Sequence, residues 1–99
     1  MGFQELDPLL HNQLRLSIMS VLISNESAEF SHLLESSGAT RGNLSVQISK
    51  LKEGGYISVK KSFRNNYPLT TCKITKKGIE AFENYVKAIS GYLNTGRGE

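Results

Sequence analysis

The chain has 99 residues and a net charge of +3, but the charge is unevenly distributed: residues 1–39 carry −4, residues 40–78 carry +8 and residues 79–99 carry −1. A chain of this length forms one domain, residues 1–99, with little room for an enclosed substrate site, so we predict that it is not an enzyme. Its apolar runs are too short for a membrane span, its single cysteine favours the cytoplasm, and its histidines and cysteine lack metal-ligand spacing, so we expect no metal and no other cofactor.

Three helices are predicted in the first half of the chain from apolar residues at helical spacing, with capping residues at the starts and polar or glycine residues at the ends. Their predicted boundaries are Asp7-Pro8 to Leu22, Ser31 to Gly38, and Thr40 to Gly54-Gly55. Only Ala39 separates the second helix from the start signal of the third. The sequence therefore predicts a helix, a tight turn and a helix.

Beyond the third helix the hydrophobic period changes to that of strands. The segments 56–63 and 69–75 are rich in strand-forming residues. Asn65 and Asn66 lie between them and tolerate a positive φ, which predicts a hairpin turn with a basic tip. Thr75 is then expected to cap a last, long helix.

The third helix is predicted to be amphipathic, with Leu44, Ile48 and Leu51 on one face and polar residues on the other. Such polar side chains can read base edges in a major groove, and a segment with a charge of +8 attracts a polyanion. A solvated lysine-rich face without a partner is the alternative. The residues predicted to read bases are Arg41, Asn43, Ser45, Val46, Gln47 and Ser49, with Gly42 allowing close approach, and those predicted to hold the DNA backbone are Lys50, Lys60, Lys61, Arg64 and Asn65.

Three stretches of sequence carry a family resemblance. HNQLRLSIM at residues 11–19, TRGNLSVQISKLKEGGYI at 40–57 and PLTTCKITKKG at 68–78 resemble small winged-helix transcriptional regulators of the MarR/ArsR type. The resemblance implies an α+β winged helix-turn-helix fold with three helices, a β-hairpin wing and a C-terminal dimerisation helix. It also implies a homodimer on double-stranded DNA. The paired cysteines of metal-sensing relatives are absent, and any small-molecule effector is unknown.

The last predicted helix carries an apolar seam at alternating spacings of three and four residues, which is a heptad pattern. Either the helix lays this seam on its own core or it pairs with a second copy, and we predict pairing. The predicted dimerisation residues are Ile79, Phe82, Tyr85, Val86, Ile89 and Leu93. The expected division is a core at 6–78, a dimerisation helix at 79–93 and a fraying tail at 94–99.

The sequence thus predicts a cytoplasmic, homodimeric regulator that binds specific duplex DNA, most simply a repressor that occludes a promoter. The alternative function is a winged-helix interaction module that docks onto an acidic protein. We expect Cys72 in the core rather than as a redox sensor. Arg15 is left open between a phosphate contact and a carboxylate of its own acidic segment.

Overall fold

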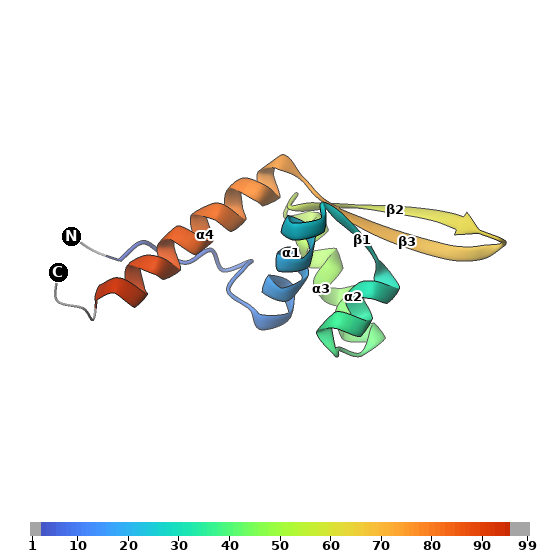
Figure 1. Cartoon of the computed structure of the whole chain (residues 1–99), viewed down its shortest axis with the longest axis horizontal. Helices are drawn as coiled ribbons and strands as arrows, with labels where there is room; N and C mark the ends of the chain where they lie inside the picture. The colour runs from blue at the N-terminus through green and yellow to red at the C-terminus, as the bar shows by residue number, and fades with distance from the viewer. Residues whose placement is uncertain (1–2, 96–99) are drawn as a thin grey trace.

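The computed structural model describes residues 3–95, which form helices packed against a three-stranded antiparallel sheet (Figure 1). In chain order the elements are α1 (Gln13–Asn25), β1 (Ser27–Glu29), α2 (Phe30–Ser37), α3 (Arg41–Glu53), β2 (Ile57–Arg64), β3 (Tyr67–Ile74) and α4 (Lys76–Thr95). The strand order is β1-β3-β2, so β1 adds to the base of the hairpin. The predicted α+β fold is confirmed.

Side-chain caps and a left-handed residue fix several boundaries as predicted. Thr40 accepts a hydrogen bond of 3.2 Å from the backbone N–H of Asn43 at the start of α3. Thr75 accepts one of 3.0 Å from the N–H of Gly78 at the start of α4. Gly38 follows α2 with a φ of 70°, the left-handed conformation that ends many helices.

The predicted start of α1 at Asp7 is wrong. Asn12 is the N-cap, because its side chain accepts a hydrogen bond of 2.9 Å from the N–H of Arg15. The Asp7 carboxylate instead accepts from the N–H of Leu9 at 2.9 Å and closes only one isolated turn. The first helix therefore starts at Gln13, one turn and a half later than expected.

Two further boundaries differ from the prediction. α2 begins at Phe30 rather than at Ser31, because β1 leads directly into it and Glu29 occupies the N-cap position without a side-chain bond. α4 continues through Thr95, so the helix includes the first residues of the predicted tail. Residues 96–99 of that tail lie outside the described residues.

The hairpin turn has the predicted geometry. Asn65 and Asn66 have φ values of 50° and 69°, and Arg64 pairs with Tyr67 on either side of them. This two-residue turn matches the twist of the strands it joins. β1 pairs only with residues 71–73 of β3, so the outer half of the hairpin projects as a two-stranded ribbon (Figure 1).

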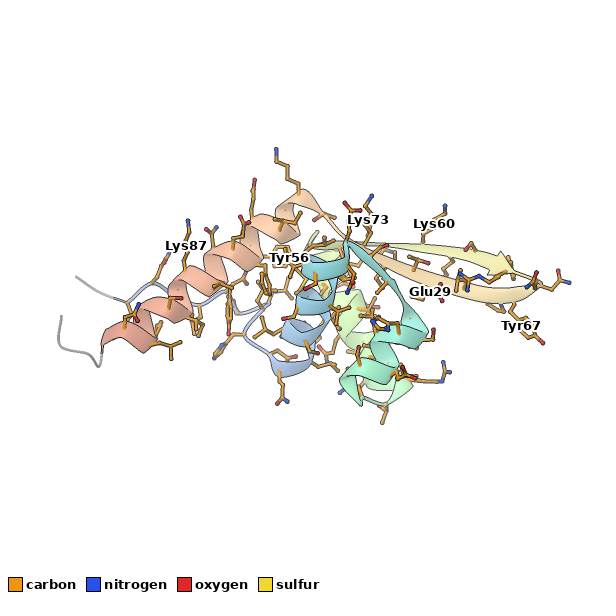
Figure 2. All side chains as sticks on the ribbon, in the orientation of Figure 1. Glu29, Tyr56, Lys60, Tyr67, Lys73 and Lys87 are labelled. Atoms are coloured by element: carbon orange, nitrogen blue, oxygen red, sulfur yellow. The ribbon has the colours of Figure 1, made fainter. Side chains whose placement is uncertain are left out.

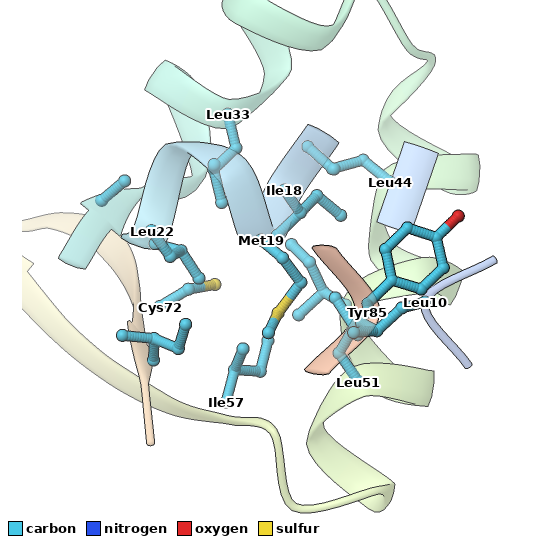
Figure 3. Packing of buried hydrophobic residues seen from close by; sticks show 13 residues of the cluster. Leu10, Ile18, Met19, Leu22, Leu33, Leu44, Leu51, Ile57, Cys72 and Tyr85 are labelled. Carbon is cyan, nitrogen blue, oxygen red and sulfur yellow. The ribbon is translucent and has the colours of Figure 1, made fainter. Parts of the chain in front are cut away.

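The core lies where α1, α2, α3, the base of the hairpin and α4 meet (Figure 3). Its largest fully buried side chains are Leu10, Ile18, Met19, Leu22, Leu33, Leu44, Leu51 and Cys72. The predicted apolar stripe of α3 is buried in it, which leaves the polar stripe outside. Cys72 is a core residue as expected, and burial raises the pKa of its thiol to about 11.

The hairpin and α4 extend from opposite ends of this core (Figure 1). The molecule measures 58 × 25 × 20 Å, and its radius of gyration of 15.3 Å exceeds the value of about 13 Å for a compact domain of this size. The start of α4 packs closely against the body, because Gly78 leaves no space for a Cβ beside the backbone carbonyl of Tyr56. The fold thus places two slender elements on either side of one small core.

Candidate nucleic-acid interface

α3 presents its polar face to solvent. The side chains of Leu44, Ile48 and Leu51 anchor the opposite face in the core. The exposed residues of α3 include Arg41, Gly42, Asn43, Ser45, Val46, Ser49 and Lys50. All of these were predicted contact residues, and the fold brings them together on one helical surface with the donors and acceptors that base edges require.

A basic groove of about 600 Å³ separates α3 from the hairpin. Arg41, Lys52 and Lys61 line it, and no acidic side chain is among its described lining residues. Ile48 contributes to its apolar floor together with Phe30, whose ring centre lies 5.8 Å from the Arg41 guanidinium carbon. The groove therefore combines positive charge with a partly apolar surface, next to the exposed face of α3.

Strand alternation separates the two neighbouring lysines of the hairpin. Lys61 shares its side of the sheet with Ile57 and Val59, which face the core, and it lines the groove. Lys60 pairs with Thr71 on the opposite side, and Figure 2 shows its side chain directed away from α2 and α3. Only Lys61 therefore lies on the same side as the exposed face of α3.

The hairpin tip holds an ion pair. One terminal nitrogen of Arg64 lies 2.7 Å from a carboxylate oxygen of Glu29, and the Arg64 side chain remains 62% exposed. An exposed pair of this kind contributes about 0–1 kcal/mol, so a phosphate can compete for the guanidinium. Phe63 and Tyr67 are strongly exposed beside it. Phe63 was predicted as a strand former and Tyr67 as part of the turn, and neither was predicted as a contact residue.

Arg15 pairs with no carboxylate within residues 3–95, and its side chain bonds instead to a backbone carbonyl and to an amide of α3. Its Nε donates to the carbonyl oxygen of Leu9 at 2.6 Å, and a terminal nitrogen donates to the side-chain oxygen of Gln47 in α3. The Gln47 amide nitrogen in turn donates to the side-chain oxygen of Asn43 at 3.0 Å. Because 32 residues separate Arg15 from Gln47, no local pattern in the sequence could have shown this contact.

The apolar seam of α4 does not lie on one surface. Tyr85 is only 7% exposed, and its hydroxyl shares a hydrogen bond of 2.9 Å with Nδ1 of His11. Tyr85, one of the predicted dimerisation residues, therefore packs in the core of its own chain. Phe82 and Ile89 are half-buried and also pack against this core.

Three seam residues remain on the outside of α4. Val86 is 47% exposed, Leu93 is 72% exposed, and Ile79 is exposed one turn from the start of the helix. They recur at intervals of seven residues and so form one stripe along the helix. This stripe of Ile79, Val86 and Leu93 is the part of the predicted seam that is free to meet another surface.

The N-terminal segment covers a different flank of α4 (Figure 1). Phe3 stacks on Tyr92 with the ring centres 4.5 Å apart, and the Tyr92 hydroxyl donates to the carbonyl oxygen of Gln4 at 3.2 Å. Asp7 accepts a hydrogen bond from the Tyr56 hydroxyl, and burial together with this carboxylate raises the pKa of Tyr56 to about 12. The segment is thus fixed at both ends.

The chain belongs to the family described as the winged helix DNA-binding domain, whose model matches residues 14–93. It is therefore a winged-helix DNA-binding domain, and its partner is DNA. An uncharacterized protein of Methanocaldococcus jannaschii is 37% identical over 81 residues, which cover 82% of this chain and 88% of that protein.

Solved structures show the same architecture in transcriptional regulators. A transcriptional regulator homologue from Pyrococcus horikoshii OT3 superposes with a TM-score of 0.82 at 28% identity, over 88% of this chain and 86% of that one. The transcriptional regulator BldR from Sulfolobus solfataricus gives a TM-score of 0.71 at 18% identity, over 85% of this chain and 59% of that one. Across residues 3–95, every helix is too short or too polar to span a membrane, and no three side chains of His, Cys, Asp or Glu are grouped to hold a metal ion.

Proposed function

We propose that the chain is a homodimeric regulator of transcription that binds specific duplex DNA and acts by binding alone. The observation that supports this most strongly is the exposed polar face of α3 beside a basic groove that ends at the hairpin. In the proposed complex α3 enters a major groove, and the hairpin reaches the neighbouring minor groove. The DNA backbone between these two grooves then passes over Lys52 and Lys61.

The proposed contacts divide into reading and holding. Arg41, Asn43, Ser45, Val46, Gln47 and Ser49 meet base edges, and Gly42 lets the helix approach them. Lys50, Lys60, Lys61, Arg64 and Asn65 meet the DNA backbone. Lys60 can do so only where the DNA curves around the far side of the hairpin, whereas Lys61 already lies in the groove. We therefore expect Lys61 to contribute more than Lys60 to the affinity for DNA.

The exposed stripe of α4 supports the dimer. Ile79, Val86 and Leu93 lie on the flank that the N-terminal segment leaves uncovered. A two-fold contact between two such stripes would bury apolar surface that the protomer leaves in water. It would also join two α3 helices into one unit that reads two related half-sites.

Repression follows as the simplest mode of action. A protein that covers a promoter excludes the polymerase by occupancy alone, whereas activation requires a further productive contact. The proposed regulator therefore needs only affinity, specificity and a dimer interface. The candidates for affinity and specificity are α3 and the hairpin, and the candidate for the dimer interface is α4.

Selection of bound duplexes from a random pool tests the proposal. We expect a palindromic consensus and an affinity that falls steeply with salt. Arg41→Ala should weaken binding to the consensus while leaving random duplex binding nearly unchanged, and Lys61→Ala should weaken both alike. Failure to retain any duplex, or retention without salt dependence, would contradict the proposal and favour an interaction module for an acidic protein.

A further inference from the structure

A relay of three side chains connects α1 to the exposed face of α3. Arg15 is anchored through Nε to the carbonyl oxygen of Leu9 at 2.6 Å. It donates to the amide oxygen of Gln47, whose amide nitrogen donates to the amide oxygen of Asn43 at 3.0 Å. Arg15 and Gln47 are half-buried, while Asn43 is exposed. The relay therefore begins on the protein backbone and ends at the surface proposed to meet DNA.

Arginine determines the direction of every hydrogen bond in the relay. Its guanidinium has five N–H donors and no acceptor, so the Gln47 atom that faces it must be the oxygen. The Gln47 atom that faces Asn43 is then the nitrogen, and the Asn43 atom that receives it must be the oxygen. The amide nitrogen of Asn43, with its two N–H donors, is the group left to solvent.

We propose that this relay makes Arg15 a specificity-determining residue, because it fixes Asn43 as a hydrogen-bond donor toward DNA and so selects guanine at the base pair that Asn43 meets. Guanine offers two acceptors in the major groove, N7 and O6, which suit an outward NH₂ group. Adenine offers one acceptor and one donor, and an asparagine pairs with both only when its oxygen is also available. In the relay that oxygen is turned toward Gln47, from which it accepts, while the nitrogen is the group that faces outward.

The inference rests on the proposed function, since it assumes that α3 reads bases. It differs from that function in what it requires of Arg15, which need not touch DNA. Arg15→Met keeps the length of the side chain but removes its donors, so the Gln47 and Asn43 amides become free to rotate. Arg15→Lys is the conservative control, because lysine also donates and never accepts.

Gln47→Glu provides an independent test that leaves the contact between Arg15 and Leu9 in place. A glutamate accepts from Arg15 and has no donor for Asn43, so its second oxygen should accept from the Asn43 nitrogen instead. The Asn43 oxygen would then point outward. The variant should reverse the preference at this base pair, from the acceptors of guanine to the donors of adenine or cytosine.

The experiment compares selected sequences rather than affinities, because the added charge of Gln47→Glu weakens binding to all DNA. The relevant base pair is the one at which Asn43→Ala abolishes discrimination. There we expect guanine to be preferred about tenfold over adenine by the native chain and by Arg15→Lys. We expect the preference to fall to about twofold in Arg15→Met and to reverse in Gln47→Glu.

Circular dichroism and binding to random duplex establish that each variant is folded. A native preference for adenine at this base pair, or an unchanged guanine preference in both Arg15→Met and Gln47→Glu, would overturn the inference while leaving the proposed function intact. A native chain that retains no duplex, or that selects no consensus, would overturn both.

Discussion

Val86→Asp provides the sharpest test of the proposed dimer. The Val86 side chain is 47% exposed, so an aspartate there remains hydrated in the isolated chain. In a dimer formed through Ile79, Val86 and Leu93 the same carboxylate would be buried without a partner. The variant should therefore be a folded monomer.

The magnitude follows from two contributions. Full burial of a valine contributes about 1.5–3 kcal/mol, so the exposed half of Val86 offers roughly 1 kcal/mol to an interface per protomer. Burying an unpaired carboxylate costs several kcal/mol more, and the two-fold axis doubles both effects. A total of about 5 kcal/mol or more raises the dissociation constant of the dimer by at least about three orders of magnitude.

Sedimentation equilibrium measures the oligomeric state, and circular dichroism measures the fold. Asn94→Asp is the matched control, because it adds the same charge at an exposed position outside the stripe and should stay dimeric. Ile89→Asp should also lose thermal stability, since Ile89 packs against the core of its own chain. A Val86→Asp protein that remains dimeric would place the interface elsewhere, and one that unfolds would refute the assignment of Val86 to the outside of α4.

Three further outcomes are expected. If a dimer contacts about six to ten phosphates, the logarithm of affinity should fall against the logarithm of salt with a slope of roughly −5 to −9, and a slope near zero would exclude the proposed interface. Glu29→Gln frees Arg64 from its ion pair and should raise the affinity for duplex DNA about two- to fivefold at low salt, as measured by fluorescence anisotropy. An unchanged affinity would mean that Arg64 does not reach the DNA. Because burial raises the pKa of Cys72 to about 11, the neutral thiol stabilises the folded state fully below pH 9, and this stabilisation is lost as the pH rises to 11. Denaturant titrations of Cys72→Val should not show this fall in the free energy of unfolding. A thiol reagent should label the folded native protein only as fast as the protein unfolds.

Local sequence signals predicted the parts of the fold that depend on local chemistry. Thr40 and Thr75 cap helices because each hydroxyl reaches an N–H three residues ahead. The Asn65-Asn66 turn forms because asparagine tolerates the left-handed region. The apolar stripe of α3 likewise predicted which of its faces is exposed, and hence most of the candidate interface.

Contacts between distant segments explain what could not be predicted. Asp7 and Asn12 are both good capping residues, and the choice between them involves the Tyr56 hydroxyl, which occupies the Asp7 carboxylate from 49 residues away. The sequence pattern of α4 could not show which flank the body covers, so it did not reveal that Tyr85 is buried and shares a hydrogen bond with His11. Arg15 was ambiguous for the same reason, since its partner lies on another helix.

The outer half of the hairpin has a consequence for how binding can be followed. Beyond residues 71–73 the ribbon has no third strand, and Phe63, Arg64 and Tyr67 are exposed. Two strands alone are marginally stable in water, so we expect these amides to exchange their hydrogens through local opening, well before the amides of the core. Bound DNA would slow this exchange in the hairpin without changing exchange in the core. Amide exchange of the hairpin therefore measures the contact between the hairpin and the minor groove separately from the contact made by α3.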